Sequence, residues 1–67
     1  MKVTLDEQLA ELGRELALRR NVYPMFVAKG RMEQSEADLH MMRLEAAIKT
    51  LTWLKENRAA IVEGAFA

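Results

Sequence analysis

The residues best suited to chemistry are two adjacent arginines that stand about one helical turn before an aromatic side chain. Arg19 and Arg20 precede Tyr23 and Pro24, and a guanidinium pairs with a carboxylate and stacks on a ring at the same time. Arginine and tyrosine are frequent in the few positions that dominate the energy of protein interfaces. Arg20 is the stronger candidate, because Glu15 precedes Arg19 by four residues, the spacing of an ion pair within one helix. Two interpretations of Arg19 are open: partner binding, or an intramolecular pair with Glu15.

His40 is the other residue whose type suggests chemistry. It follows Glu36 by four residues, so the two side chains share one helical face. Such a pair holds a metal only when further ligands arrive from elsewhere, and the chain has no cysteine and no second histidine to supply them. We therefore interpret His40 as a structural side chain and expect no metal site and no cofactor. No nucleophile with a neighbouring base, glycine-rich phosphate loop or carboxylate pair stands out, so we expect no enzyme activity and no catalytic residue.

A first helix, predicted over about residues 5–29, must position the arginines. Thr4 and Glu7 form a capping box at its start, and Gly30 suits the left-handed turn that ends a helix. Pro24 removes one helical hydrogen bond, so the helix either kinks there or gives way to a new short helix. Apolar residues on both sides keep one helical period, which favours a kinked but continuous path. They are Leu5, Leu9, Leu12, Leu16, Tyr23 and Phe26.

A second helix is predicted over about residues 34–62, with Gly64 as its stop. One apolar face carries Ala37, Met41, Leu44, Ile48 and Leu51, continued by Leu54 and Ile61. Another face, about 100° or more away around the helix, carries Met42, Ala46 and Trp53. An apolar arc this wide requires contact with more than one helix.

The two helices together predict an all-α fold: residues 1–67 form a single helical hairpin that dimerises into an antiparallel four-helix bundle. We assign core and dimer contacts to Leu12, Leu16, Met41, Leu44, Ile48, Leu51 and Leu54. We assign partner binding to Arg19, Arg20, Tyr23, Phe26 and Trp53. Gly13, inside the first helix, either marks a close approach of another backbone or is a tolerated surface glycine.

Length and composition support self-association and narrow the class of partner. A chain of 67 residues buries only about 60% of its unfolded surface, and without cysteine it has no disulfides to compensate. The net charge is zero, divided into +2 for residues 1–32 and −2 for residues 33–67, which disfavours nucleic acid as a partner. No apolar run reaches the roughly 20 residues that cross a bilayer, and no signal-peptide segment is present. We expect a cytoplasmic protein with no membrane partner.

The segment from Arg19 to Met32 resembles part of small uncharacterised proteins of tailed bacteriophages and prophages. The shared pattern is a basic pair, Val-Tyr-Pro at residues 22–24, Val27, Gly-Arg at residues 30–31 and Glu-Ala-Asp at residues 36–38. The likeness covers nearly the whole chain. One departure is Glu33, where such proteins commonly place a threonine or serine N-cap. Within this group the chain is similar to the phage quorum-sensing anti-activator proteins, which are helical hairpins that dimerise.

The resemblance implies a phage-encoded accessory protein that acts in the host bacterial cytoplasm. Its implied partners are a LasR-type quorum-sensing transcription activator and the type IV pilus assembly ATPase, so it implies host takeover by protein–protein interaction. Two alternatives stay open: a structural or assembly helper within the phage, and a small nucleic-acid-associated regulator. The net negative charge of the second helix counts against the regulator, because a recognition helix presents basic and polar side chains to the DNA groove.

Overall fold

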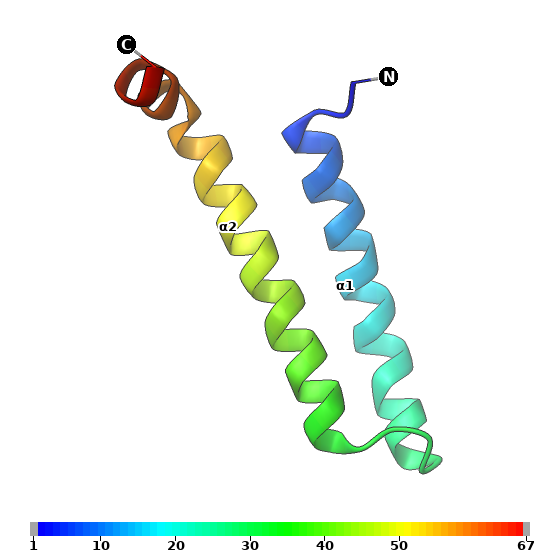
Figure 1. The fold of residues 1–67 in the computed structure, drawn as a ribbon. Coiled ribbons are helices and arrows are strands. Elements are labelled where there is room, and N and C mark those ends of the chain that lie inside the picture. Colours follow the sequence, from blue (N-terminus) through cyan, green and yellow to red (C-terminus); the bar gives the residue numbers. More distant parts are fainter. Residues whose placement is uncertain (1, 67) are drawn as a thin grey trace.

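The computed structural model is a hairpin of two antiparallel helices joined by a short connection (Figure 1). It describes the backbone of residues 2–66 and the side chains of residues 2–58. Helix α1 spans Leu5–Ala28 and helix α2 spans Gln34–Phe66, and no strand occurs in the described backbone. The hairpin measures 53 × 24 × 16 Å, and both ends of the chain lie at the same end of it. The predicted all-α helical hairpin is confirmed.

Helix α1 begins at the predicted capping box. The Glu7 backbone N–H donates to Thr4 Oγ1 at 3.1 Å, and the Thr4 N–H donates to Glu7 Oε1 at 3.2 Å. These bonds satisfy amide groups that have no partner within the first turn. The helix then passes through Pro24 without interruption. The prediction of one continuous helix through Pro24 is therefore confirmed, and no new helix begins there. The predicted kink stays a prediction.

A Schellman motif ends α1 and turns the chain toward α2. The Arg31 N–H donates to the Phe26 carbonyl at 2.9 Å, and the Gly30 N–H donates to the Val27 carbonyl at 3.1 Å. Gly30 has φ +71°, the left-handed conformation predicted for it. This conformation costs a residue with a Cβ atom about 1–2 kcal/mol, so glycine is the residue that suits this position.

Alanine at the two glycines of the hairpin is expected to change stability in opposite directions. Gly30→Ala should lower the free energy of unfolding by about 1 kcal/mol, because alanine resists a positive φ. Gly13→Ala should raise it by about 0.4–1 kcal/mol, because Gly13 is helical and a Cβ there meets no atom within 4 Å. Urea unfolding at one protein concentration measures both changes. Equal stability of Gly30→Ala and the parent would contradict the strained turn, and a destabilised Gly13→Ala would indicate that another chain approaches Gly13.

Helix α2 is longer than predicted. It runs to Phe66, beyond the end expected near residue 62, so the prediction that Gly64 stops the helix was wrong. A glycine within a helix costs about 1 kcal/mol relative to alanine but keeps its backbone hydrogen bonds. It ends a helix where the chain also turns left-handed, as it does at Gly30. Ile61, predicted to continue the apolar stripe, lies outside the described side chains.

The two helices face each other in one constant register. Arg19 Nη1 donates to the His40 carbonyl at 3.1 Å, and Lys55 Nζ lies 2.6 Å from Asp6 Oδ1 near the other end of the hairpin. In both pairs the residue numbers add up to about 60, as expected of antiparallel helices that each rise 1.5 Å per residue. Residue numbers that add up to about 60 therefore identify facing positions along the seam.

The seam between the helices buries little side-chain surface. Among the described side chains, Ala37 and Leu44 are the buried apolar residues, at 4% and 7% exposure. The other predicted core residues are half-buried: Leu12, Leu16, Met41, Ile48, Leu51 and Leu54. Of the predicted core residues, Leu44 is thus buried, and the assignment of the others to core and dimer contacts stays a prediction. Two helices alone leave most of them partly open to water.

The ion pair between Asp6 and Lys55 is expected to be detectable as a lowered pKa of the Asp6 carboxyl. The hydrogen bond from Lys55, followed by the attraction of its charge, holds the pKa of Asp6 below its ordinary value of 3.8. Because the folded pKa is lowered, the pair stabilises the fold above the unfolded pKa, and this contribution is lost as pH falls through the folded pKa. NMR titration of the Asp6 carboxyl should give a pKa below 3.8 that returns toward 3.8 in Lys55→Met. The same pKa in both proteins would contradict the pairing.

Candidate functional site: a groove at the hairpin tip

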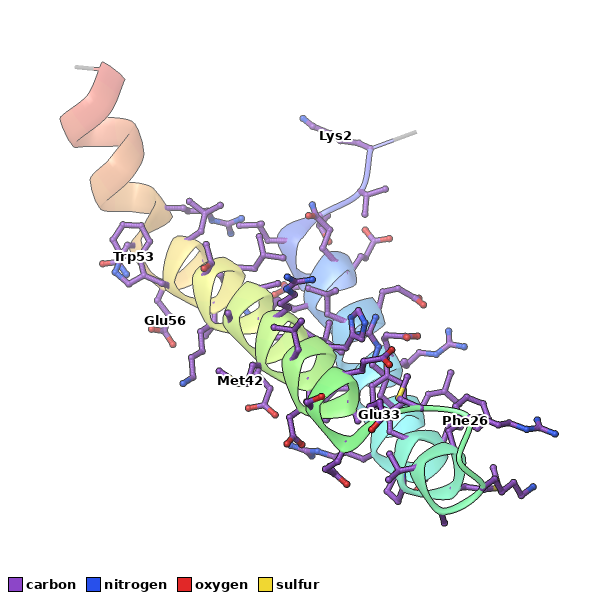
Figure 2. The ribbon with its side chains drawn as sticks, turned by 60° about the horizontal axis from the view of Figure 1, so that its bottom comes forward. Lys2, Phe26, Glu33, Met42, Trp53 and Glu56 are labelled. Carbon is purple, nitrogen blue, oxygen red and sulfur yellow. The ribbon has the colours of Figure 1, made fainter. Side chains whose placement is uncertain are left out.

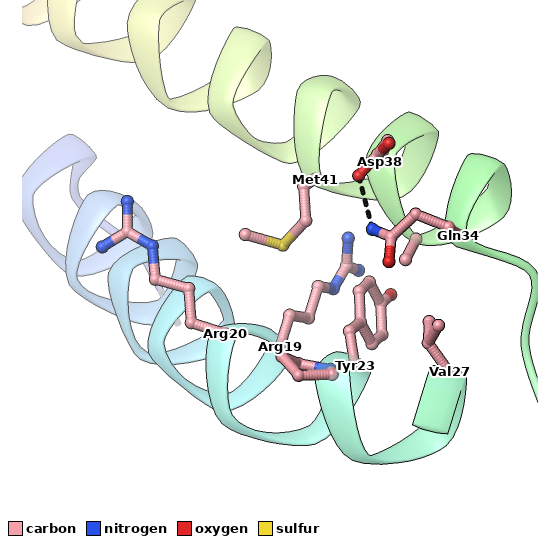
Figure 3. A pocket seen from close by; sticks show the side chains of 9 residues that line it. Arg19, Arg20, Tyr23, Val27, Gln34, Asp38 and Met41 are labelled. Carbon is pink, nitrogen blue, oxygen red and sulfur yellow. Dashed lines mark hydrogen bonds between the residues drawn. The ribbon is translucent and has the colours of Figure 1, made fainter. Parts of the chain in front are cut away.

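An open groove of about 230 Å³ lies between α1 and α2 near the connection between them, and we call it the tip groove (Figure 3). Side chains of both helices line it, so it exists only when the hairpin is closed. Its lining residues are Arg19, Arg20, Tyr23, Pro24 and Val27 from α1 and Gln34, Ala37, Asp38 and Met41 from α2.

Arg19 is held in the tip groove by contacts within the hairpin. Its Nε donates to Glu15 Oε1 at 2.8 Å and its Nη1 donates to the His40 carbonyl at 3.1 Å. The guanidinium carbon also lies 5.9 Å from the centre of the Tyr23 ring, within range of a cation–π contact. The predicted ion pair with Glu15 is confirmed. A guanidinium has five N–H donors, so Arg19 keeps three donors beyond these two hydrogen bonds.

Arg20 differs from its neighbour in having no hydrogen bond or ion pair within the described part of the chain. It is exposed, and it extends along the edge of the tip groove on the side away from Tyr23 (Figure 3). Its full positive charge is therefore available to a partner. This is the arrangement that the Glu15 spacing predicted for the two arginines.

The α2 wall of the tip groove is polar at its rim and apolar at its base. Gln34 Nε2 donates to Asp38 Oδ1 at 2.9 Å, which fixes an amide and a carboxylate along the rim (Figure 3). Ala37, at 4% exposure, and Met41 supply the apolar base. The groove thus offers a cation on one rim, a carboxylate on the other and apolar surface between them, which suits a polypeptide segment with charged and apolar side chains.

The structure brings together three of the five residues predicted to bind a partner. Arg19, Arg20 and Tyr23 all line the tip groove. Phe26 is half-buried at the tip and is not among the lining residues. Trp53 is 57% exposed and projects from the side of α2 that faces away from α1 (Figure 2). Trp53 therefore belongs to a different surface from the tip groove.

The residues that form the α2 side of the tip groove were not predicted from the sequence. The sequence patterns do not single out Gln34 or Asp38 as binding residues, and they place Ala37 only in the apolar stripe of the second helix. The signal that would have found them is the hairpin register, because positions facing Arg20 and Tyr23 fall between residues 37 and 41 once the connection is short. That register depends on the left-handed turn at Gly30.

The described residues offer no group of three or more His, Cys, Asp and Glu side chains that could hold a metal ion. His40 is half-buried, and its backbone carbonyl is the atom that contacts Arg19. No helix in the described part of the chain is long and apolar enough to cross a membrane. No family model, curated protein or solved structure matches the chain.

Proposed function

We propose that the chain is a phage-encoded protein-interaction module that binds and inhibits a host bacterial protein. The proposed targets are a LasR-type quorum-sensing transcription activator and the type IV pilus assembly ATPase, as the resemblance of residues 19–38 implies. The proposed contact surface centres on the tip groove, with Arg20 as the main polar anchor. The protein would act in the host cytoplasm, without catalysis, by covering a surface that its target needs.

One observation carries this proposal: within the described residues the hairpin fully buries one large apolar side chain, Leu44, and leaves several others exposed to water. Six of them within the described residues are more than 40% exposed: Val3, Leu18, Met25, Leu39, Met42 and Trp53. Exposed apolar side chains are ordinary one at a time. Together with a seam that, within the described residues, fully buries only Ala37 and Leu44, these side chains support the proposal that other proteins cover part of the apolar surface.

A second copy of the chain is part of the proposed function. An isolated two-helix hairpin has too small a core to be stable by the ordinary balance of burial and entropy. Association of two hairpins covers apolar surface on both and leaves one tip groove on each. A dimer would therefore present two copies of the binding surface to a dimeric or multimeric host target.

Direct binding to the two proposed targets tests this function. Purified LasR-type activator and purified pilus ATPase are each titrated with the chain, and the affinities are measured by calorimetry. Micromolar or tighter binding that blocks DNA binding by the activator, or ATP hydrolysis by the ATPase, supports the proposal. If neither protein binds, the proposed targets are wrong. Association with virion proteins in infected cells would then identify an assembly role.

A further inference from the structure

A stripe of apolar side chains follows the side of α2 opposite to the hairpin seam. Leu39, Met42 and Trp53 are 43%, 67% and 57% exposed, and exposed Ala46 lies between them. At about 100° per residue these four positions lie within about 60° of one another, and roughly 180° from buried Leu44. Figure 2 shows Met42 and Trp53 on this side, away from α1. We call these four residues the outer stripe.

The outer stripe has the pattern of a two-fold symmetric contact. Leu39 and Trp53 each stand seven residues from Ala46, so an antiparallel copy centred on Ala46 sets Trp53 of one chain against Leu39 of the other. Met42 then faces Thr50 of the other copy. A small residue at the centre allows the helix backbones to approach closely, and larger side chains fill the space on both sides. A two-fold interface requires the same patch on both partners, and this stripe is complementary to itself.

The charged side chains nearest the centre of the outer stripe also fit an antiparallel pairing of two α2 helices. Glu45 and Lys49 lie on one flank of α2, and an antiparallel copy brings Glu45 of one chain near Lys49 of the other. Asp38 and Glu56 also face each other across this flank at the two ends of the stripe, where water screens their repulsion. The apolar side chains therefore provide the main attraction, and the central charges favour the antiparallel direction.

We infer that the outer stripe is the surface on which a second copy of the chain docks, antiparallel, with the two-fold axis near Ala46. This inference rests on the dimer in the proposed function and fixes its geometry. The four helices lie side by side in the order α1, α2, α2, α1, in place of a closed bundle. Trp53 then belongs to the dimer contact. The two tip grooves lie at opposite ends of the dimer, free to bind a target.

Cysteine cross-linking tests the position of the two-fold axis. The chain has no cysteine, so a single Ala46→Cys introduces one thiol at the proposed axis, close enough to its copy to form a disulfide. Ala17→Cys is the matched control, because Ala17 is an exposed helical alanine on α1. At micromolar protein under mild oxidation, Ala46→Cys should form covalent dimer at least tenfold faster than Ala17→Cys. Equal rates, or faster cross-linking of Ala17→Cys, would overturn the inference.

A charge within the stripe tests the interface without relying on a disulfide. Met42 is 67% exposed, so Met42→Glu removes little within one hairpin, and it should raise the dissociation constant of the dimer at least tenfold by sedimentation equilibrium. The single tryptophan, Trp53, should shift its emission to shorter wavelength as the parent associates, and should lose this shift in Met42→Glu. If the dimer tolerates Met42→Glu and Trp53 stays in water, the two copies associate through another face. Binding of a host target through Arg20 is tested separately, by the affinity of Arg20→Ala for the target.

Discussion

Leu44→Ala is expected to lower the free energy of unfolding by about 2–5 kcal/mol, a large part of the stability of so small a protein. Leu44 is the most buried large side chain in the described seam, at 7% exposure, and truncation of a buried leucine costs about 2–5 kcal/mol. A domain of this length has a total stability of roughly 3–10 kcal/mol at the usual 0.05–0.15 kcal/mol per residue. Thermal unfolding followed by circular dichroism, at one fixed protein concentration, measures the loss of helix and of melting temperature.

Leu18→Ala is the matched control for this experiment. It makes the same substitution in α1, but Leu18 is 55% exposed and lies outside the seam. Its effect should stay within about 0.5 kcal/mol. If Leu44→Ala melts at the same temperature as Leu18→Ala, the seam between α1 and α2 is not the core of the protein in solution.

Arg20→Ala is expected to weaken binding of the host target at least tenfold and to leave helix content unchanged. Arg20 is exposed and makes no hydrogen bond or ion pair within the described residues, so its removal leaves the hairpin contacts intact. Truncation of an arginine that anchors an interface costs about 2 kcal/mol or more in binding. Calorimetric titration of the proposed targets gives the affinity, and circular dichroism checks the fold.

Two further variants separate a specific contact from a general effect of charge. Arg14→Ala removes an exposed arginine of the same helix whose neighbour is Glu11 at 3.6 Å, remote from the tip groove, and should leave binding unchanged. Arg20→Lys keeps the charge but loses the planar fork, and should restore only part of the affinity. Equal binding by the parent, Arg14→Ala and Arg20→Ala would move the target site away from the tip groove.

The fold was largely predictable because each helix carries its own local signals. The capping box at Thr4, the apolar period through Leu12 and Leu16 and the left-handed turn at Gly30 all depend on neighbouring residues. The wrong prediction that Gly64 ends the second helix also rested on a local signal. A glycine permits a helix to end but does not require it to end. The wide apolar arc of α2 was also predictable from the sequence, because the helical period alone places Leu44 and Met42 on different faces of the helix.

The candidate site was predictable only on its α1 side. Arg19, Arg20 and Tyr23 are close in sequence, so their grouping follows from one helical turn. Gln34 and Asp38 reach the groove from the second helix, and their placement depends on the register that the connection sets. Trp53 was grouped with the arginines by residue type, although it lies on the opposite face of α2. Residue type indicates which side chains can bind a partner. The register between α1 and α2 determines which of these side chains lie on the same surface.

The short connection at residues 29–33 also sets the order in which the hairpin forms. Closing a loop costs entropy that grows with the logarithm of its length. Tyr23 and Ala37 face each other across few residues, whereas Asp6 and Lys55 meet only after almost the whole chain is ordered. We therefore expect contacts at the tip to form first and to lower the entropic cost of each later contact. The hairpin would then close from the tip toward its free ends. On this order of events, the tip groove is the first part of the hairpin to form and the last part to open.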